Sequence, residues 1–199
     1  RDLELRGAGI LLGADQSGFA TQIGLDAYMR LLRKTVERLE KGEEAIDWPD
    51  PDVSMHGPSY LPDSYVADSS QKLHLYRRLS KAQSRTEVEG LKDELEDRFA
   101  TLPVEAERLL DAATIRILGR NLGLERAIVR EDSARLTFRE GVVPKLSRLE
   151  GPLRQRQAAM DVLRVHPLSV KLVAEGLEPV LETTLVALTA LVSARGAAA

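Results

Sequence analysis

The chain has 199 residues, of which 43% are hydrophobic and 30% are charged, and this balance excludes a chain that is disordered throughout. Only 4% are aromatic, so the core must be built mainly from aliphatic side chains. The net charge of -3 argues against nucleic-acid binding by the whole chain through charge alone, but it leaves room for one local DNA contact. The lack of cysteine excludes disulfides and thiolate metal sites and suits a reducing compartment, so we expect a cytoplasmic location.

Two segments precede the main predicted domain. Residues 1–24 are punctuated by glycines, and helical stretches broken in this way predict a short hairpin or hook. Over residues 25–41 apolar side chains recur at steps of three and four, which predicts an amphipathic helix that ends at Gly42. The rest of the segment 25–51 is polar and contains Pro49 and Pro51, so we expect it to be a linker.

The main domain is predicted to open with a short strand over residues 52–57 and then a helix. An extended approach places the start of this helix near Asp68 or Ser69, either of which can cap it. His74 lies one residue from the apolar face of the helix, so we expect it at the surface or the boundary of the core. The apolar face is expected to consist of Leu73, Tyr76 and Leu79.

Two more helices are predicted to follow. The second should run from Thr86 to Phe99, because Thr86 and Glu89 have the spacing of a capping box. Pro103 should open the third helix, where a missing N–H costs little, and Gly123 should close it. Their apolar faces are expected to be Val88, Leu91, Leu95 and Phe99 on the second helix, and Ala106, Leu109, Leu110, Ala113 and Ile117 on the third.

After the third helix the apolar period changes from helical to alternating. Residues 126–130 and 134–138 predict one hairpin, and residues 161–165 and 169–173 predict another. A short helix is expected over 142–149 between the two hairpins. A long amphipathic helix should close the chain, with Leu177, Val180, Leu181, Leu185, Leu188, Leu191 and Val192 on its apolar face.

This order of elements predicts the fold class. Strands that come in adjacent pairs, rather than alternating with helices, indicate an α+β fold. We expect an N-terminal helical hook and long helix, then one compact domain over residues 52–199. In that domain, helices should pack on a small, mainly antiparallel sheet.

Charge is distributed unevenly between the first two helices of the domain. The first has a basic side with Lys72, Arg77, Arg78 and Lys81, and the second carries Glu87, Glu89, Asp93, Glu94, Glu96 and Asp97. We interpret them as neighbouring solvated helices of opposite charge, with a partner-binding surface as the alternative. Trp48, beside Pro49, is expected to pack onto the domain, although interfaces also favour tryptophan.

The most specific pattern lies at the start of the chain, where residues 2–18 read DLELRGAGILLGADQSG. This stretch resembles the translocation motif shared by RecG-type branch-migration motors and transcription-repair coupling factors, and it matches every fixed position of that motif. The resemblance implies a hook that follows the second motor lobe and couples ATP-driven lobe movement to steps along duplex DNA. The residues that it assigns to motor coupling are Arg6, Gly7, Gly9, Gly13, Gln16, Ser17 and Gly18.

The remaining sequence separates the two branches of this family. Residues 61–124 resemble the C-terminal domain of transcription-repair coupling factors, a module that RecG-type motors lack. Two positions depart from the family pattern, Ala67 in place of proline and Ala100 in place of glycine. An alanine in a left-handed helix-ending conformation is strained, so the turn at Ala100 is expected to differ locally. The stretches that carry the resemblance are 61–66, 71–79, 91–99 and 102–103.

The resemblance implies that this chain is the C-terminal part of an ATP-dependent double-stranded-DNA translocase of helicase superfamily 2. The whole protein would displace stalled RNA polymerase and recruit UvrA for nucleotide excision repair, with ATP and magnesium bound in motor lobes upstream of Arg1. The C-terminal domain would dock on the parent's own N-terminal UvrB-like module and mask the UvrA-binding surface. The alternative is a DNA-binding accessory module of a RecG-like motor.

The sequence offers no constellation for catalysis. It contains no phosphate-binding loop of the form G-x-x-x-x-G-K-[ST] and no helicase acid box, so we expect no ATP hydrolysis by this chain itself. His56, His74 and His166 are too dispersed for a metal site or a catalytic triad. No apolar run approaches the roughly 18 residues of a membrane span. We therefore expect no cofactor, no metal and no membrane association.

Overall fold

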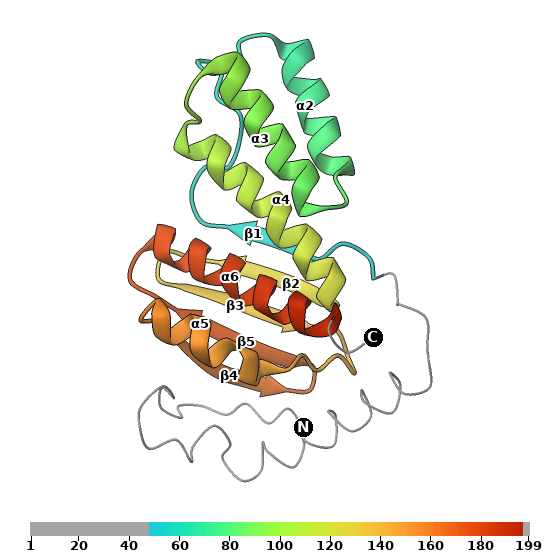
Figure 1. Cartoon of the computed structure of the whole chain (residues 1–199), viewed down its shortest axis with the longest axis vertical. Helices are drawn as coiled ribbons and strands as arrows, with labels where there is room; N and C mark the ends of the chain where they lie inside the picture. Colours follow the sequence, from blue (N-terminus) through green and yellow to red (C-terminus); the bar gives the residue numbers. More distant parts are fainter. Residues whose placement is uncertain (1–47, 197–199) are drawn as a thin grey trace.

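The computed structural model describes residues 48–196, with side chains described as far as Ser193. The predicted hook over 1–24 and the predicted helix over 25–41 lie outside the described residues. Three helices form one end of the described part, namely α2 (Ser69–Lys81), α3 (Arg85–Phe99) and α4 (Val104–Leu122), and a sheet with its own helices forms the other end (Figure 1).

Helix α2 begins as predicted but buries a different face. The carboxylate of Asp68 caps it by accepting a hydrogen bond from the backbone N–H of Gln71 at 2.7 Å. Leu75 and Leu79 are buried, whereas Leu73 is 49% exposed. The predicted face was wrong at this position because strict steps of three drift around a helix of 3.6 residues per turn, and the buried pair is separated by four.

Helix α3 has the predicted apolar face, but its capping box lies two residues earlier than expected. Ser84 adopts an extended conformation, and its hydroxyl accepts a hydrogen bond from the Glu87 backbone N–H at 3.3 Å. The Glu87 carboxylate accepts in return from the Gln83 backbone N–H at 3.2 Å. Thr86 is already inside the helix, and Glu89 instead pairs with Arg85 at 2.7 Å. Ser84 and Glu87 therefore replace Thr86 and Glu89 as the cap.

Helix α4 has the predicted ends. Pro103 occupies the capping position, and Gly123 closes the helix in the left-handed conformation with φ of 72°. A Cβ atom on Gly123 would lie 2.9 Å from the indole nitrogen of Trp48, so a second feature also requires glycine here. The ring of Trp48 has the Arg139 guanidinium 6.0 Å from its centre. Trp48 thus packs onto the domain, as predicted.

Both predicted hairpins are present in one mixed sheet. Its strands are β1 (Asp52–Met55), β2 (Leu124–Val129), β3 (Ser133–Phe138), β4 (Ala159–Val165) and β5 (Leu168–Val173). Their spatial order is β1-β2-β3-β5-β4. Only the pairing of β1 with β2 is parallel, and the other three pairings are antiparallel. The sheet is therefore mainly antiparallel, as expected, with its one parallel strand at an edge.

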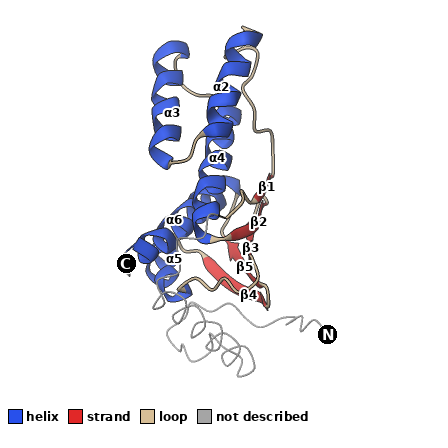
Figure 2. Cartoon of the chain, turned by 90° about the vertical axis from the view of Figure 1, so that its right-hand side faces the viewer, coloured by secondary structure: helices blue, strands red, loops and turns tan. Residues whose placement is uncertain are grey.

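Helices cover one face of this sheet (Figure 2). The covering elements are α6 (Leu177–Gly196), the short helix α5 (Glu150–Gln155) and the 3₁₀ turn η1 (Leu146–Leu149) that precedes it. The short helix predicted over 142–149 thus begins later and runs further. The physical reason is Pro144, which disfavours a helical conformation at the residue before it.

Helix α4 joins two hydrophobic clusters and confirms the α+β class. Its residues Leu110 and Ile117 pack with α2, α3 and the loop before α2 in a first cluster, which contains no strand residue. Its residues Ile115 and Leu118 belong to the second cluster, which lies between the sheet and α6. Only the first of these two faces was predicted. In the described part of the chain no helix is long and apolar enough to span a membrane.

Candidate functional surfaces

The residues assigned to motor coupling lie outside the described residues. Arg6 and Gln16, the two polar positions of the motif, fall in this region, and so do the other five. The structure therefore does not test how these residues are arranged, and their role stays a prediction. The seven positions are Arg6, Gly7, Gly9, Gly13, Gln16, Ser17 and Gly18.

The exposed side of α3 is an acidic surface. Arg78 of α2 binds Glu94 at 2.6 Å, and Arg98 binds the same carboxylate at 2.8 Å. The guanidinium of Arg78, followed by that of Arg98, holds the pKa of Glu94 below its usual range. This contact confirms that the two helices are neighbours of opposite charge. Three other acids of α3 are exposed and have no ion pair with a described residue. We call these three residues the α3 acidic surface: Asp93, Glu96 and Asp97.

The α3 acidic surface is held in place by an aromatic anchor at the end of the helix. The hydroxyl of Tyr65 lies 2.9 Å from the backbone carbonyl oxygens of both Leu95 and Ala100, and its single proton is shared between these two acceptors. The rings of Tyr65 and Phe99 lie 5.7 Å apart, and the Arg98 guanidinium lies 4.9 Å from the centre of the Phe99 ring. The loop before α2 is thereby fixed to the C-terminal end of α3.

An arginine on α4 secures the opposite end of the α2–α3 pair. The Arg116 guanidinium donates to the carbonyls of Leu79 and Ala82, at 3.2 and 2.9 Å, at the C-terminal end of α2. It also binds Asp50 at 2.7 Å, and Arg120 lies 3.7 Å from the same carboxylate. The side chain of Arg116 is only 16% exposed, so it bridges the segment before β1, α2 and α4. Sequence reasoning missed this residue, because nothing local distinguishes Arg116 from its neighbours.

A second group of acids lies where α4 passes the start of α6. Burial, and then the negative charges of Glu107 and Glu178, raise the pKa of Asp111 to about 6. The positive charge of Lys92 opposes this rise in pKa, and Arg108 donates to Glu178 at 2.8 Å. Within residues 48–193 no three acidic or histidine side chains are arranged to hold a metal ion. In the sequence, Asp111 is distinguished only by being a charged residue on the apolar side of a predicted helix.

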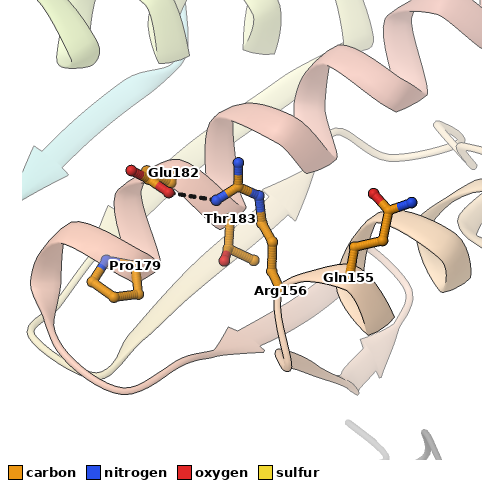
Figure 3. A pocket seen from close by; sticks show the side chains of 5 residues that line it. All are labelled: Gln155, Arg156, Pro179, Glu182 and Thr183. Atoms are coloured by element: carbon orange, nitrogen blue, oxygen red, sulfur yellow. Dashed lines mark hydrogen bonds and ion pairs between the residues drawn. The ribbon is translucent and has the colours of Figure 1, made fainter.

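A shallow hollow of about 470 Å³ lies between the end of α5 and the start of α6 (Figure 3). Arg156 crosses it and binds Glu182 at 2.5 Å, while Gln155 and Pro179 form its sides. The hydroxyl of Thr183 is buried and has no hydrogen-bond partner among the described residues. The hollow holds no histidine, cysteine or serine beside a base, so these residues provide no nucleophile for catalysis.

The family comparison matches the helical part and the start of the sheet. Residues 55–148 match the model of the TRCF domain. A solved structure titled as the C-terminal domain of transcription-repair coupling factor superposes with a TM-score of 0.66 at 18% identity. That match covers 76% of this chain and 98% of the solved chain, and it shows a shared fold. The class defined by fold and domain is therefore a TRCF-type C-terminal domain.

Curated relatives extend the match. The chain is 36% identical over 170 residues to the transcription-repair-coupling factor of Escherichia coli K12, covering 77% of this chain and 15% of that protein. Identity is 40% over 126 residues with the Staphylococcus epidermidis protein of the same name, and 33% over 140 residues with that of Bacillus subtilis. The chain belongs to the transcription-repair coupling factor family. It spans only 11 to 15% of the length of these relatives.

Proposed function

We propose that this chain is the C-terminal regulatory part of an ATP-dependent DNA translocase that displaces stalled RNA polymerase and recruits UvrA for excision repair. The observation that carries the proposal is the 36% identity with the Escherichia coli transcription-repair-coupling factor over 170 residues. In this proposal, ATP and magnesium bind to motor lobes of the parent protein that lie outside this chain. The chain itself contributes coupling and regulation and no catalysis.

The coupling part of the proposal rests on the motif over residues 2–18. Arg6 has a planar, multi-donor guanidinium that can contact carboxylates or phosphates in a fixed geometry, so it can sense the position of a neighbouring lobe. Gln16 offers both a donor and an acceptor for the same purpose. Gly7, Gly9 and Gly13 allow helix backbones to approach closely. These residues would transmit lobe movement to the DNA.

The regulatory part of the proposal is intramolecular docking on the parent's N-terminal UvrB-like module. The α3 acidic surface supports this role, because Asp93, Glu96 and Asp97 project from a helix whose position is fixed by Tyr65 and by the Arg78–Glu94 pair. Exposed carboxylates without local ion pairs are available to arginine or lysine on a partner. Docking there would mask the UvrA-binding surface until another ligand releases it.

The proposal is tested by titrating the purified chain into the isolated N-terminal module and measuring heat of binding. We expect saturable binding that UvrA competes for. The triple variant Asp93→Asn, Glu96→Gln, Asp97→Asn should weaken binding at least about tenfold, because electrostatic pairing across the interface is lost. A matched triple variant removes three exposed carboxylates elsewhere, and it should bind like the original chain: Glu125→Gln, Glu140→Gln, Glu175→Gln.

Two results would count against this proposal. Equal weakening in both triple variants would show that total charge, rather than the α3 acidic surface, governs binding. Absence of saturable binding to the module would contradict docking and leave the accessory module of a RecG-like motor as the alternative.

A further inference from the structure

The face of the sheet opposite α6 carries a row of basic side chains. Residues paired across strands point to the same side of a sheet, so the register assigns each side chain to a face. Arg126 is paired with Thr137, and Arg135 is paired directly with Lys171. The next strand adds Arg164, which is paired with Ser169. We call these four cations, one from each of β2, β3, β5 and β4 in spatial order, the basic row: Arg126, Arg135, Lys171 and Arg164.

The basic row lies on the face that no described element covers. The inward partners on these strands, such as Ala127, Leu136 and Val170, belong to the buried cluster beneath α6. Figure 2 shows α4, α5 and α6 on one side of the sheet and no described helix on the other. Arg126 and Arg135 are exposed on that open side, and Lys171 and Arg164 are half-buried.

Most of the positive charge in the basic row has no partner among the described residues. Arg126 pairs with Asp52 at 3.1 Å. No carboxylate within residues 48–193 lies at ion-pair distance from Arg135, Lys171 or Arg164. Arg135 and Lys171 are directly opposite, and Asp161 is paired with Lys171 on its other side, so this row of the open face also contains one carboxylate.

We infer that the basic row binds the phosphate backbone of duplex DNA. Arg126 and Arg164 lie three strand spacings apart, or roughly 14 Å at about 4.8 Å each, a length that covers about four axial steps of ~3.4 Å along one DNA strand. Between the cations the hydroxyls of Thr137 and Ser169 hydrogen-bond each other at 3.3 Å, and Ser169 is buried, so only the half-buried Thr137 hydroxyl can add a contact to a phosphate oxygen. The site is distinct from the α3 acidic surface.

The same face argues for a duplex rather than a single strand. Proteins that bind single strands combine a basic track with aromatic side chains on which bases stack. None of the paired positions on the open face is aromatic, and the non-basic ones on β2, β3 and β5 are Ile128, Ser133, Thr137, Ser169 and Val173. Contacts would therefore be limited to phosphates, without reading sequence.

The test is fluorescence anisotropy of the full chain with a labelled duplex of about 20 base pairs, starting near 50 mM salt. The double variant Arg135→Gln, Lys171→Gln should bind at least about tenfold more weakly, and its plot of log K against log salt should be shallower by roughly 1.8. The matched control Arg77→Gln, Lys81→Gln removes two exposed cations of α2 and should bind within about twofold of the original chain.

A variant that removes a negative charge from the same face should change DNA affinity in the opposite direction. Asp161 is paired with Lys171 in the register, so Asp161→Asn removes a negative charge from the open face. It should tighten duplex binding about two- to threefold at low salt. Thermal melting of each variant shows whether it is folded. The Arg135→Gln, Lys171→Gln protein should melt close to the original, because the change removes both the repulsion between Arg135 and Lys171 and the attraction between Lys171 and Asp161.

Several outcomes would overturn the inference. They are absence of duplex binding at low salt, equal loss in the α2 control, or tighter binding of a single strand of the same length. Binding of polyglutamate in preference to the duplex would instead identify an acidic protein segment as the ligand of the basic row. None of these outcomes depends on the N-terminal module, so failure here leaves the proposed docking function unaffected.

Discussion

Ala100 has a positive φ, which is unfavourable for a residue with a Cβ atom. It follows α3 with φ of 71° and ψ of -163°, a region occupied almost only by glycine. Its carbonyl accepts the hydrogen bond from Tyr65, and its N–H donates to the Glu96 carbonyl at 3.1 Å. The surrounding contacts therefore hold Ala100 at a positive φ despite its Cβ atom, and the predicted local difference of this turn from the family pattern stays a prediction.

Ala100→Gly should stabilise the domain by about 1 kcal/mol, because relief of strain of ~1–3 kcal/mol exceeds the added entropy of the unfolded chain. Urea unfolding followed by circular dichroism measures this change. Ala82→Gly is the control, since Ala82 has an ordinary φ of -58° and is buried, and that change should lower stability. An unchanged midpoint for Ala100→Gly would contradict the strain argument.

Asp111 makes stability depend on pH in a direction opposite to most carboxylates. Its pKa of about 6 in the folded state lies above the value of 3.8 expected when unfolded, so the folded state binds the proton more tightly. The contribution of Asp111 to stability is therefore fully present below about pH 4 and is lost as pH rises through 6. Asp111→Asn should be more stable than the original by about 1–2 kcal/mol at pH 7.5, with the gain shrinking toward pH 4. Denaturant melts at both pH values check this, and a gain that is the same at both would be the contrary result.

At the scale of elements, the helix ends follow local chemistry while the helix faces follow contacts. Asp68 caps the start of α2 and Gly123 closes α4, as predicted from residue type. The cap of α3 was predicted at Thr86 and Glu89, but Ser84 and Glu87 have the same spacing. The extended backbone at Ser84 places the cap at Ser84 and Glu87.

Ser84→Ala should lower the free energy of unfolding by about 1 kcal/mol, since the Glu87 backbone N–H loses its acceptor. Thr86→Ala removes the other candidate cap, and as a solvent-exposed position inside the helix it should change stability by less than about 0.5 kcal/mol. Thermal melts of the two single variants compare them directly. A larger loss for Thr86→Ala would restore the originally predicted cap.

At the scale of the whole molecule, α4 makes two hydrophobic clusters depend on one helix. Leu110 lies in the helical cluster and Leu118 lies in the cluster beneath the sheet. Arg116, between them in sequence, adds the hydrogen bonds to α2 and the ion pair to Asp50. We therefore expect the two clusters to unfold together.

Leu110→Ala and Leu118→Ala should each cost about 2–5 kcal/mol, and each should lower one shared transition rather than split it. Trp48 fluorescence reports on the contact with Gly123 and Arg139 beside the sheet, while far-ultraviolet circular dichroism is dominated by the helices. Coincident midpoints from the two probes are the expected result. Separate midpoints in Leu110→Ala would mean that the helical cluster unfolds independently.

The sequence by itself determined the α+β class, the position of the hairpins, most helix ends and the family, because these depend on residue type and on apolar spacing within short windows. The tertiary structure alone decided the second apolar face of α4, the roles of Arg116 and Asp50, and the raised pKa of Asp111. It also decided the alignment of Arg126, Arg135, Lys171 and Arg164. These features join residues that are distant in the chain, and their geometry follows from strand order, register and burial, none of which is encoded in local periodicity.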